Sequence, residues 1–62
     1  MSYDPHRKTA ATIFNKSEDA ITDIERRAGK AYNLAKQYDN SDNRAMQIAM
    51  DHKKRLEDTK GA

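Results

Sequence analysis

Small and apolar residues recur at alternating spacings of three and four through the first two thirds of the chain. The series is Ala10, Phe14, Ser17, Ile21, Ile24, Ala28, Ala31, Ala35 and Tyr38. Residues three and four apart lie on one face of an α-helix, so the series forms a single stripe. A second, shorter stripe follows at Ala45, Ala49, His52 and Leu56. The pattern predicts an all-α protein.

A polar run, 39–43, separates the two stripes. Its Asp, Asn and Ser side chains compete with helical hydrogen bonds and favour turns and caps. A connection of this length suits two antiparallel helices, so we expect a helical hairpin. The last helix is expected over about 42–58, with Ser41 or Asp42 as its N-cap, and residues 60–62 should fray.

The N-terminal part of the chain is expected to form a helical extension of this hairpin. Asp4 precedes a proline, which is typical of a helix start, and a first helical segment over about 5–15 follows. Ser17, followed by two acidic residues, is a good N-cap and favours a break, with a second segment over 17–38. The unbroken stripe favours instead one helix over 5–38. Two or three helices are therefore possible.

Small residues dominate the middle of the first stripe. Alanine lets another helix approach closely but buries little area itself. Gly29 lies beside these alanines and costs about 1 kcal/mol relative to Ala inside a helix. We interpret Gly29 as an off-stripe weakness rather than a point of tight contact. The position of His52 on the second stripe predicts a partly buried packing residue, whereas His6 should be exposed.

Composition limits how stable one copy of the chain can be. The 62 residues are 35% hydrophobic and 35% charged, and we expect a single domain over 1–62. A core of this size rarely contributes more than about 3–5 kcal/mol of net stability. The sequence contains no cysteine, which excludes disulfides and thiolate metal sites. Oligomerisation is the remaining way to gain stability, so we predict a homodimeric helical bundle.

A second apolar face flanks the two stripes. We expect it to be a protein interface, and its candidate residues are Ile13, Leu34, Met46 and Met50. Surplus apolar surface on a small helix pair is typical of such interfaces. The predicted function is a small non-catalytic protein-binding module, an adaptor or inhibitor that covers a surface of a larger protein. The same face is expected to support self-association.

Charge keeps one alternative open. The formal net charge is only +2, from 12 basic and 10 acidic side chains that are interspersed, so an electrostatic footprint for nucleic acid is weak. The alternative function is a small helical DNA- or RNA-binding regulator that uses the basic last helix. Its candidate residues are Arg44, Gln47, Lys53, Lys54 and Arg55.

Other classes of function find little support in the sequence. A chain this small has little interior from which to build a catalytic pocket, so we do not expect an enzyme. Neither a histidine pair one helical turn apart nor an acidic metal-binding loop is present, so we expect no metal and no cofactor. Apolar runs are too short for a membrane span or a signal peptide, and we expect a cytoplasmic protein without membrane contact.

Overall fold

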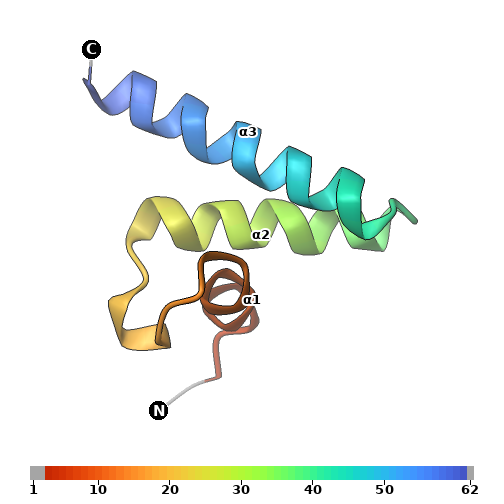
Figure 1. The fold of residues 1–62 in the computed structure, drawn as a ribbon, viewed down its shortest axis with the longest axis horizontal. Coiled ribbons are helices and arrows are strands. Elements are labelled where there is room, and N and C mark those ends of the chain that lie inside the picture. Colours follow the sequence, from red (N-terminus) through yellow and green to blue (C-terminus); the bar gives the residue numbers. More distant parts are fainter. Residues whose placement is uncertain (1–2, 62) are drawn as a thin grey trace.

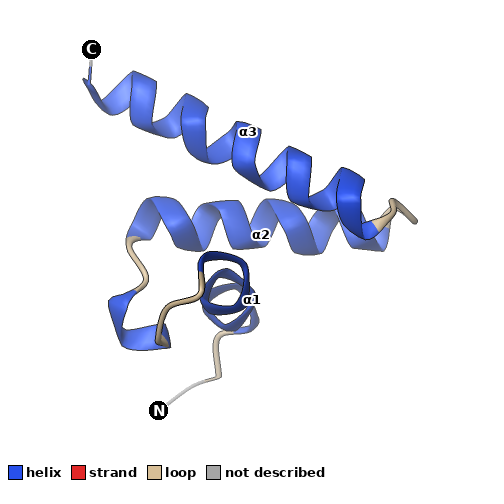
Figure 2. Cartoon of the chain, viewed as in Figure 1, coloured by secondary structure: helices blue, strands red, loops and turns tan. Residues whose placement is uncertain are grey.

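A computed structural model describes the backbone of residues 3–61 and the side chains of residues 3–59. Within this range the chain forms three α-helices and one short 3₁₀ helix, joined by short loops (Figure 2). The elements are α1 (Pro5–Phe14), η1 (Glu18–Ala20), α2 (Asp23–Gln37) and α3 (Asp42–Gly61). No strand is present in the described range, and the all-α prediction is confirmed.

The central element is α2, which packs against both other helices (Figure 1). In that view α1 is seen end-on, so it crosses α2 rather than running along it. The connection 38–41 brings α3 back against the C-terminal part of α2, and α3 then diverges from α2 towards its own C-terminus. The N-terminal part of α2 therefore faces a widening gap.

Asp4 begins α1 and also ties it to α2. Its side chain accepts hydrogen bonds from the backbone N–H groups of His6, at 3.1 Å, and Arg7, at 3.2 Å, which confirms the predicted N-cap. Its second carboxylate oxygen lies 2.7 Å from Nε of Arg26 on α2. The bond from Arg26 is the main reason why the pKa of Asp4 lies below its ordinary value. One carboxylate thus joins two helices.

The chain breaks between the first two helices, so the single-helix alternative is wrong. Asn15 adopts a left-handed conformation, with φ 54°, and ends α1 at Phe14. The predicted second start at Ser17 is also wrong, because Ser17 makes no capping hydrogen bond with its side chain. Instead, Thr22 and Glu25 form a reciprocal capping box that starts α2 at Asp23.

The connection between α2 and α3 is shorter than the polar run that predicted it. Asp39 takes a left-handed conformation, with φ 68°, and the side-chain amide of Asn40 donates to the carbonyl of Ala35 at 2.8 Å. The hydroxyl of Ser41 accepts from the backbone N–H of Arg44 and caps α3. α3 continues to Gly61, beyond the predicted end at residue 58. Residue 62 of the predicted frayed end lies outside the described range.

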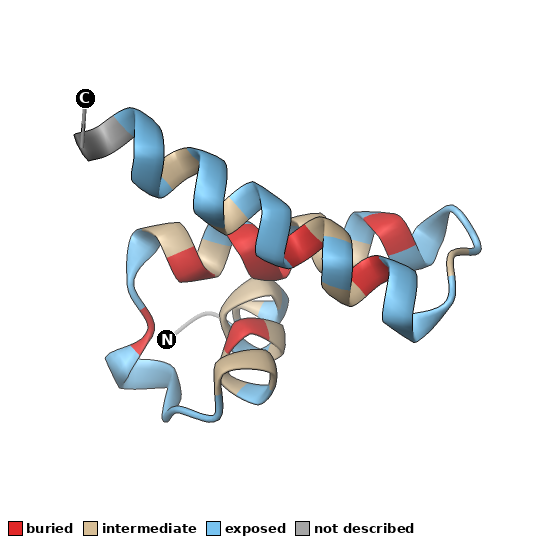
Figure 3. Cartoon of the chain, turned by 45° about the horizontal axis from the view of Figure 1, so that its top comes forward, coloured by how far each residue is buried: buried red, intermediate tan, exposed pale blue. Residues whose placement is uncertain are grey.

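The buried residues are mostly alanine (Figure 3). Those with hydrophobic side chains are Ala10, Ile21, Ala28, Ala35, Ala45 and Ala49, and Glu25 and Gly29 are also buried. Among the described residues, no large side chain is fully buried. The outer positions of the predicted stripe do not join this core, since Ser17 is exposed and Tyr38 is 78% exposed. The helices therefore approach closely but bury little apolar area.

Gly29 is a point of tight contact, which corrects the interpretation of this residue as an off-stripe weakness. It is buried where α1 crosses α2. A Cβ atom at this position would lie 2.5 Å from the carbonyl oxygen of His6 and 3.0 Å from the backbone nitrogen of Ala10. The absence of a side chain at Gly29 therefore sets how closely α1 can approach α2.

The burial of the two histidines is the reverse of the prediction. His6 is half-buried, and its Nδ1 lies 3.0 Å from the side-chain amide nitrogen of Asn33 on α2. The carbonyl oxygen of that amide accepts a hydrogen bond from the hydroxyl of Thr9 at 2.9 Å. His52 is exposed. The histidine that contributes to packing is therefore His6.

Glu25 is the buried charged residue among residues 3–59, with 6% of its surface exposed. Its carboxylate lies 2.8 Å from the ammonium group of Lys16 and accepts a hydrogen bond from the backbone N–H of Thr22. The bond from Lys16 contributes most to holding the pKa of Glu25 below its ordinary value of 4.5, and the bond from Thr22 comes next. The ionised form is therefore favoured in the folded protein.

This depressed pKa predicts acid sensitivity. The ionised Glu25 stabilises the fold above pH 4.5, its ordinary pKa, and this contribution is lost as the pH falls through the lower folded pKa. The Glu25→Gln variant keeps the capping box but loses the charge, so we expect a loss of about 1 kcal/mol at pH 7. Urea denaturation at pH 7 and pH 3 should show a smaller acid-induced loss in the variant than in the parent. Equal losses in both proteins would contradict the role of Glu25.

Candidate protein-binding surfaces

Two of the four predicted interface residues lie at one surface depression. Ile13 from α1 and Met46 from α3 line it together with Tyr32 from α2 and Tyr3, and it encloses about 400 Å³. Its polar margin consists of Lys8, Thr9 and Thr12. We call this surface the three-helix patch. All three α-helices contribute to it, so the patch exists only when α1 is docked.

The other two predicted residues are exposed and lie outside that lining. Met50 is 41% exposed and follows Met46 by one turn on the same edge of α3. Leu34 is 42% exposed on α2. Its neighbour Asn33 bonds to α1, so Leu34, about 100° further round the helix, points away from α1. Ile13 and Met46 therefore lie on the side of the molecule that carries α1, whereas Leu34 points away from that side.

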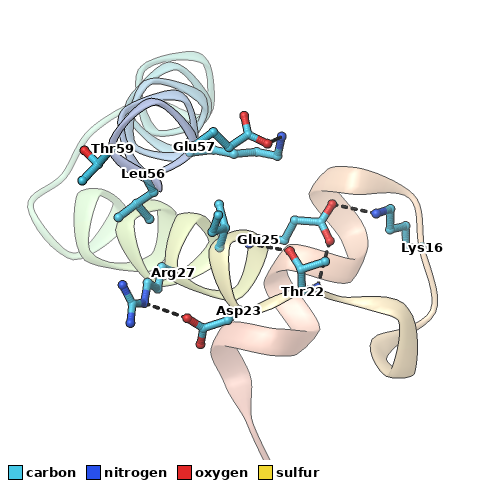
Figure 4. Close-up of a pocket in the computed structure, with 10 residues that line it drawn as sticks. Lys16, Thr22, Asp23, Glu25, Arg27, Leu56, Glu57 and Thr59 are labelled. Atoms are coloured by element: carbon cyan, nitrogen blue, oxygen red, sulfur yellow. Dashed lines mark hydrogen bonds and ion pairs between the residues drawn. The ribbon is translucent and has the colours of Figure 1, made fainter. Parts of the chain in front are cut away.

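A larger hollow lies where α3 diverges from α2, and we call it the α2–α3 groove (Figure 4). It encloses about 680 Å³. Ile24 of α2 and Leu56 of α3 provide its apolar lining, and both are partly exposed. In Figure 4 the side chain of Leu56 points from α3 towards α2. The sequence analysis placed both residues on core stripes. It missed the groove because the residue pattern does not indicate that α2 and α3 diverge.

The charged residues of the α2–α3 groove are joined in ion pairs. Lys16 pairs with Glu25 at 2.8 Å, and the closest atoms of Arg27 and Asp23 lie 3.1 Å apart. The third pair joins Lys53 and Glu57 at 2.8 Å. Basic and acidic side chains are therefore balanced around the groove.

The predicted nucleic-acid residues do not form one basic surface. Lys53 lies over the ring of Phe14 on α1, 5.7 Å from its centre, in addition to its pair with Glu57. Arg55 pairs with Asp51 at 3.1 Å, one helical turn earlier. Lys54, Arg44 and Gln47 are exposed. Since neighbouring acidic residues offset two of these cations, α3 offers little net positive charge to a phosphate backbone.

The described residues offer no metal-binding group of three or more His, Cys, Asp or Glu side chains. No described helix combines the length and apolar character needed to cross a membrane. The α2–α3 groove has threonine hydroxyls and paired charges at its margin, whereas the three-helix patch has threonine hydroxyls and Lys8.

Sequence reasoning missed two aromatic residues of the three-helix patch. Tyr3 lies before the first helix, and its ring is 5.8 Å from the ammonium group of Lys8. Tyr32 lies on α2 beside the stripe, and its hydroxyl is 3.4 Å from a carboxylate oxygen of Asp42. The available signal was the enrichment of tyrosine at protein interfaces. Comparison of the chain with protein-family models, curated proteins and solved structures finds no match.

Proposed function

We propose that this chain is a small non-catalytic protein-binding module, which acts as an adaptor or inhibitor by covering a surface of a larger protein. The observation that carries the proposal is the three-helix patch, where Ile13, Tyr32 and Met46 are only partly buried. Exposed aromatic, methionine and isoleucine side chains with a polar margin have the composition of a binding surface. Met50 extends this surface along α3.

The proposal includes an arrangement of α2 and α3 as an antiparallel hairpin that assembles into a homodimer. The alanine-rich contact between the helices supports it, because such a contact leaves larger apolar side chains without cover in a single copy. The homodimer does not replace the binding function. Leu34 and the α2–α3 groove lie outside the three-helix patch, so self-association and partner binding can use different surfaces.

The alternative of a DNA- or RNA-binding regulator has weaker support. Its five candidate residues include Lys53, whose ammonium group is directed towards Phe14 and Glu57. Arg55 is paired with Asp51. A phosphate-binding surface gains affinity from several cations that act together, and these contacts disperse the cations of α3. Protein binding is therefore the better supported function.

Site-specific cross-linking tests the binding function, because the chain has no cysteine of its own. Thr12→Cys places a thiol at the exposed margin of the three-helix patch, and Lys30→Cys places a matched thiol on an exposed position of α2. Each variant is labelled with a photo-cross-linker and added to a lysate of the source organism. We expect the label at position 12, but not at position 30, to reach a defined protein.

The competition step decides the outcome. Excess unlabelled parent chain should abolish the cross-link from position 12, whereas an unlabelled Ile13→Glu chain should compete at least tenfold less well. Circular dichroism verifies that this variant keeps the parent's helix content. Equal, unsaturable labelling from positions 12 and 30 would exclude a specific binding surface at the three-helix patch.

A further inference from the structure

The hydroxyl group of Thr9 has two acceptors within hydrogen-bond distance but only one proton. Its oxygen lies 2.9 Å from the carbonyl oxygen of Pro5 and 2.9 Å from the side-chain oxygen of Asn33. The side-chain nitrogen of Asn33 lies 3.0 Å from Nδ1 of His6. Since a hydroxyl donates a single hydrogen bond, Thr9 can donate to only one of its two acceptors at a time.

The orientation of the Asn33 side chain suits a neutral His6. The amide nitrogen is a donor only, so it donates to Nδ1, which must be the unprotonated nitrogen of the ring. Thr9 then donates to the amide oxygen of Asn33. The carbonyl oxygen of Pro5 can accept the backbone bond of the first helical turn, and it retains a second lone pair.

A proton on Nδ1 is incompatible with this orientation, because a ring N–H would face an amide N–H. Histidine takes up its proton between about pH 5 and 8. Rotation of the Asn33 amide by half a turn removes the conflict, since its oxygen then accepts from Nδ1 and its nitrogen donates to the oxygen of Thr9. Thr9 can then donate to Pro5. The reversed chain contains three hydrogen bonds, and each donor in it has an acceptor.

The charges near His6 do not hold a protonated ring in place. Four charged side chains belong to the segments that meet here, and they are Asp4, Arg7, Arg26 and Lys30. Asp4 is joined to Arg26 at 2.7 Å, Arg7 donates to two carbonyl groups between residues 18 and 21, and Lys30 is exposed. α3 meets the other end of α1, where Lys53 lies over Phe14. Among the described residues, Asn33 alone is hydrogen-bonded to the imidazole, so a protonated His6 depends on its amide oxygen.

We propose that the side-chain amide of Asn33 reverses when His6 is protonated, and that α1 stays docked on α2 in both states. In the same step the hydroxyl of Thr9 changes its acceptor from Asn33 to Pro5. Thr9 lines the three-helix patch, so the patch stays assembled and only its polar margin changes. The inference concerns the docking of α1 and holds whether or not the patch binds a protein.

NMR spectroscopy of the ¹⁵N-labelled parent chain at pH 8 and pH 5 tests the proposal. At pH 8 Nδ1 of His6 should be unprotonated, and the amide protons of Asn33 should show NOEs to the imidazole ring. At pH 5 both ring nitrogens should be protonated, and the NOEs from these amide protons to Thr9 should become at least threefold stronger. NOEs between Gly29 and the methyl group of Ala10 should persist, because they report the docking of α1.

A substitution at position 33 tests the need for the acceptor. Asn33→Leu provides neither a donor nor an acceptor, so protonation of His6 should weaken α1 docking. Its urea midpoint should fall at least twice as much between pH 8 and pH 5 as that of the parent. Asn43→Leu, the same change at an exposed position of α3, is the matched control and should follow the parent.

Three results would overturn the inference. The first is a proton on Nδ1 of His6 already at pH 8, and the second is the loss of the NOEs between Gly29 and Ala10 at pH 5. The third is an equal fall of the urea midpoint in the parent and in Asn33→Leu. The NMR measurements use the parent alone, so they decide the matter even if Asn33→Leu does not fold.

Discussion

Ala49→Leu is expected to lower the free energy of unfolding by about 1–3 kcal/mol. Ala49 is completely buried, and Ala28 and Ala45 are also without exposed surface. A leucine between helices in such close contact has no space, so α3 must move away from α2. The total stability expected for a chain of this size is about 3–5 kcal/mol, so the variant should retain only about 0–4 kcal/mol and a larger unfolded fraction than the parent at 25 °C.

The neighbouring methionine provides the control for this substitution. Met50→Leu introduces the same side chain one position further along α3, where the parent residue is 41% exposed. We expect this variant to differ from the parent by less than about 0.5 kcal/mol. Urea denaturation followed by circular dichroism at a fixed protein concentration measures both effects. If Ala49→Leu were as stable as Met50→Leu, the helix contact at Ala49 would not be close-packed.

Gly29→Ala is expected to destabilise the protein although it improves the helix propensity of α2. The gain in propensity is about 1 kcal/mol. Against it, the new Cβ atom meets the carbonyl oxygen of His6 at 2.5 Å, and backbone atoms cannot turn away as a flexible side chain can. The displacement of α1 should cost about 1–3 kcal/mol, which outweighs the gain.

Lys30→Ala is the matched control, because Lys30 is exposed on α2 next to the crossing point. It should leave the free energy of unfolding nearly unchanged, since Lys and Ala are both good helix formers. Chemical denaturation measures the two variants side by side, and the chemical shifts of α1 report its displacement. A Gly29→Ala protein more stable than the parent, with unaltered shifts in α1, would show that the crossing is looser than described.

Much of the helical structure was predictable from short-range patterns. Alanine spacing identified the faces of α2 and α3, and Asp4 identified the start of α1. The start of α2 was missed because Ser17 and Thr22 are both acceptable N-caps. The capping box at Thr22 involves two hydrogen bonds and a buried carboxylate, whereas Ser17 makes none with its side chain. The N-cap preferences of Ser17 and Thr22 alone therefore do not indicate which of the two residues begins α2.

The crossing of α1 over α2 could not be predicted in the same way. Its contacts join residues more than twenty positions apart, such as Asp4 with Arg26 and His6 with Asn33. Periodicity identifies which side of a helix is apolar but not which helix covers it. This is why Gly29 was interpreted as a weakness and why His6 was expected to be exposed.

The candidate interface was only partly predictable for the same reason. Helical spacing marked Leu34 and Met50 as surplus apolar residues, and both are exposed in the structure. It could not show that α1 would cover one side of α2 and bring Ile13 close to Met46. The α2–α3 groove depends on the divergence of two helices, and no residue pattern within either helix records that divergence.

The composite origin of the three-helix patch links recognition to folding. Ile13, Tyr32 and Met46 come from three different helices, and α1 buries only Ala10 of its own residues. A state in which α1 has detached therefore retains two helices but lacks the assembled patch. A protein that binds only the assembled patch withdraws molecules from that state, so occupancy and apparent stability rise together. The free concentration of such a protein then sets the fraction of chains in which α1 is docked.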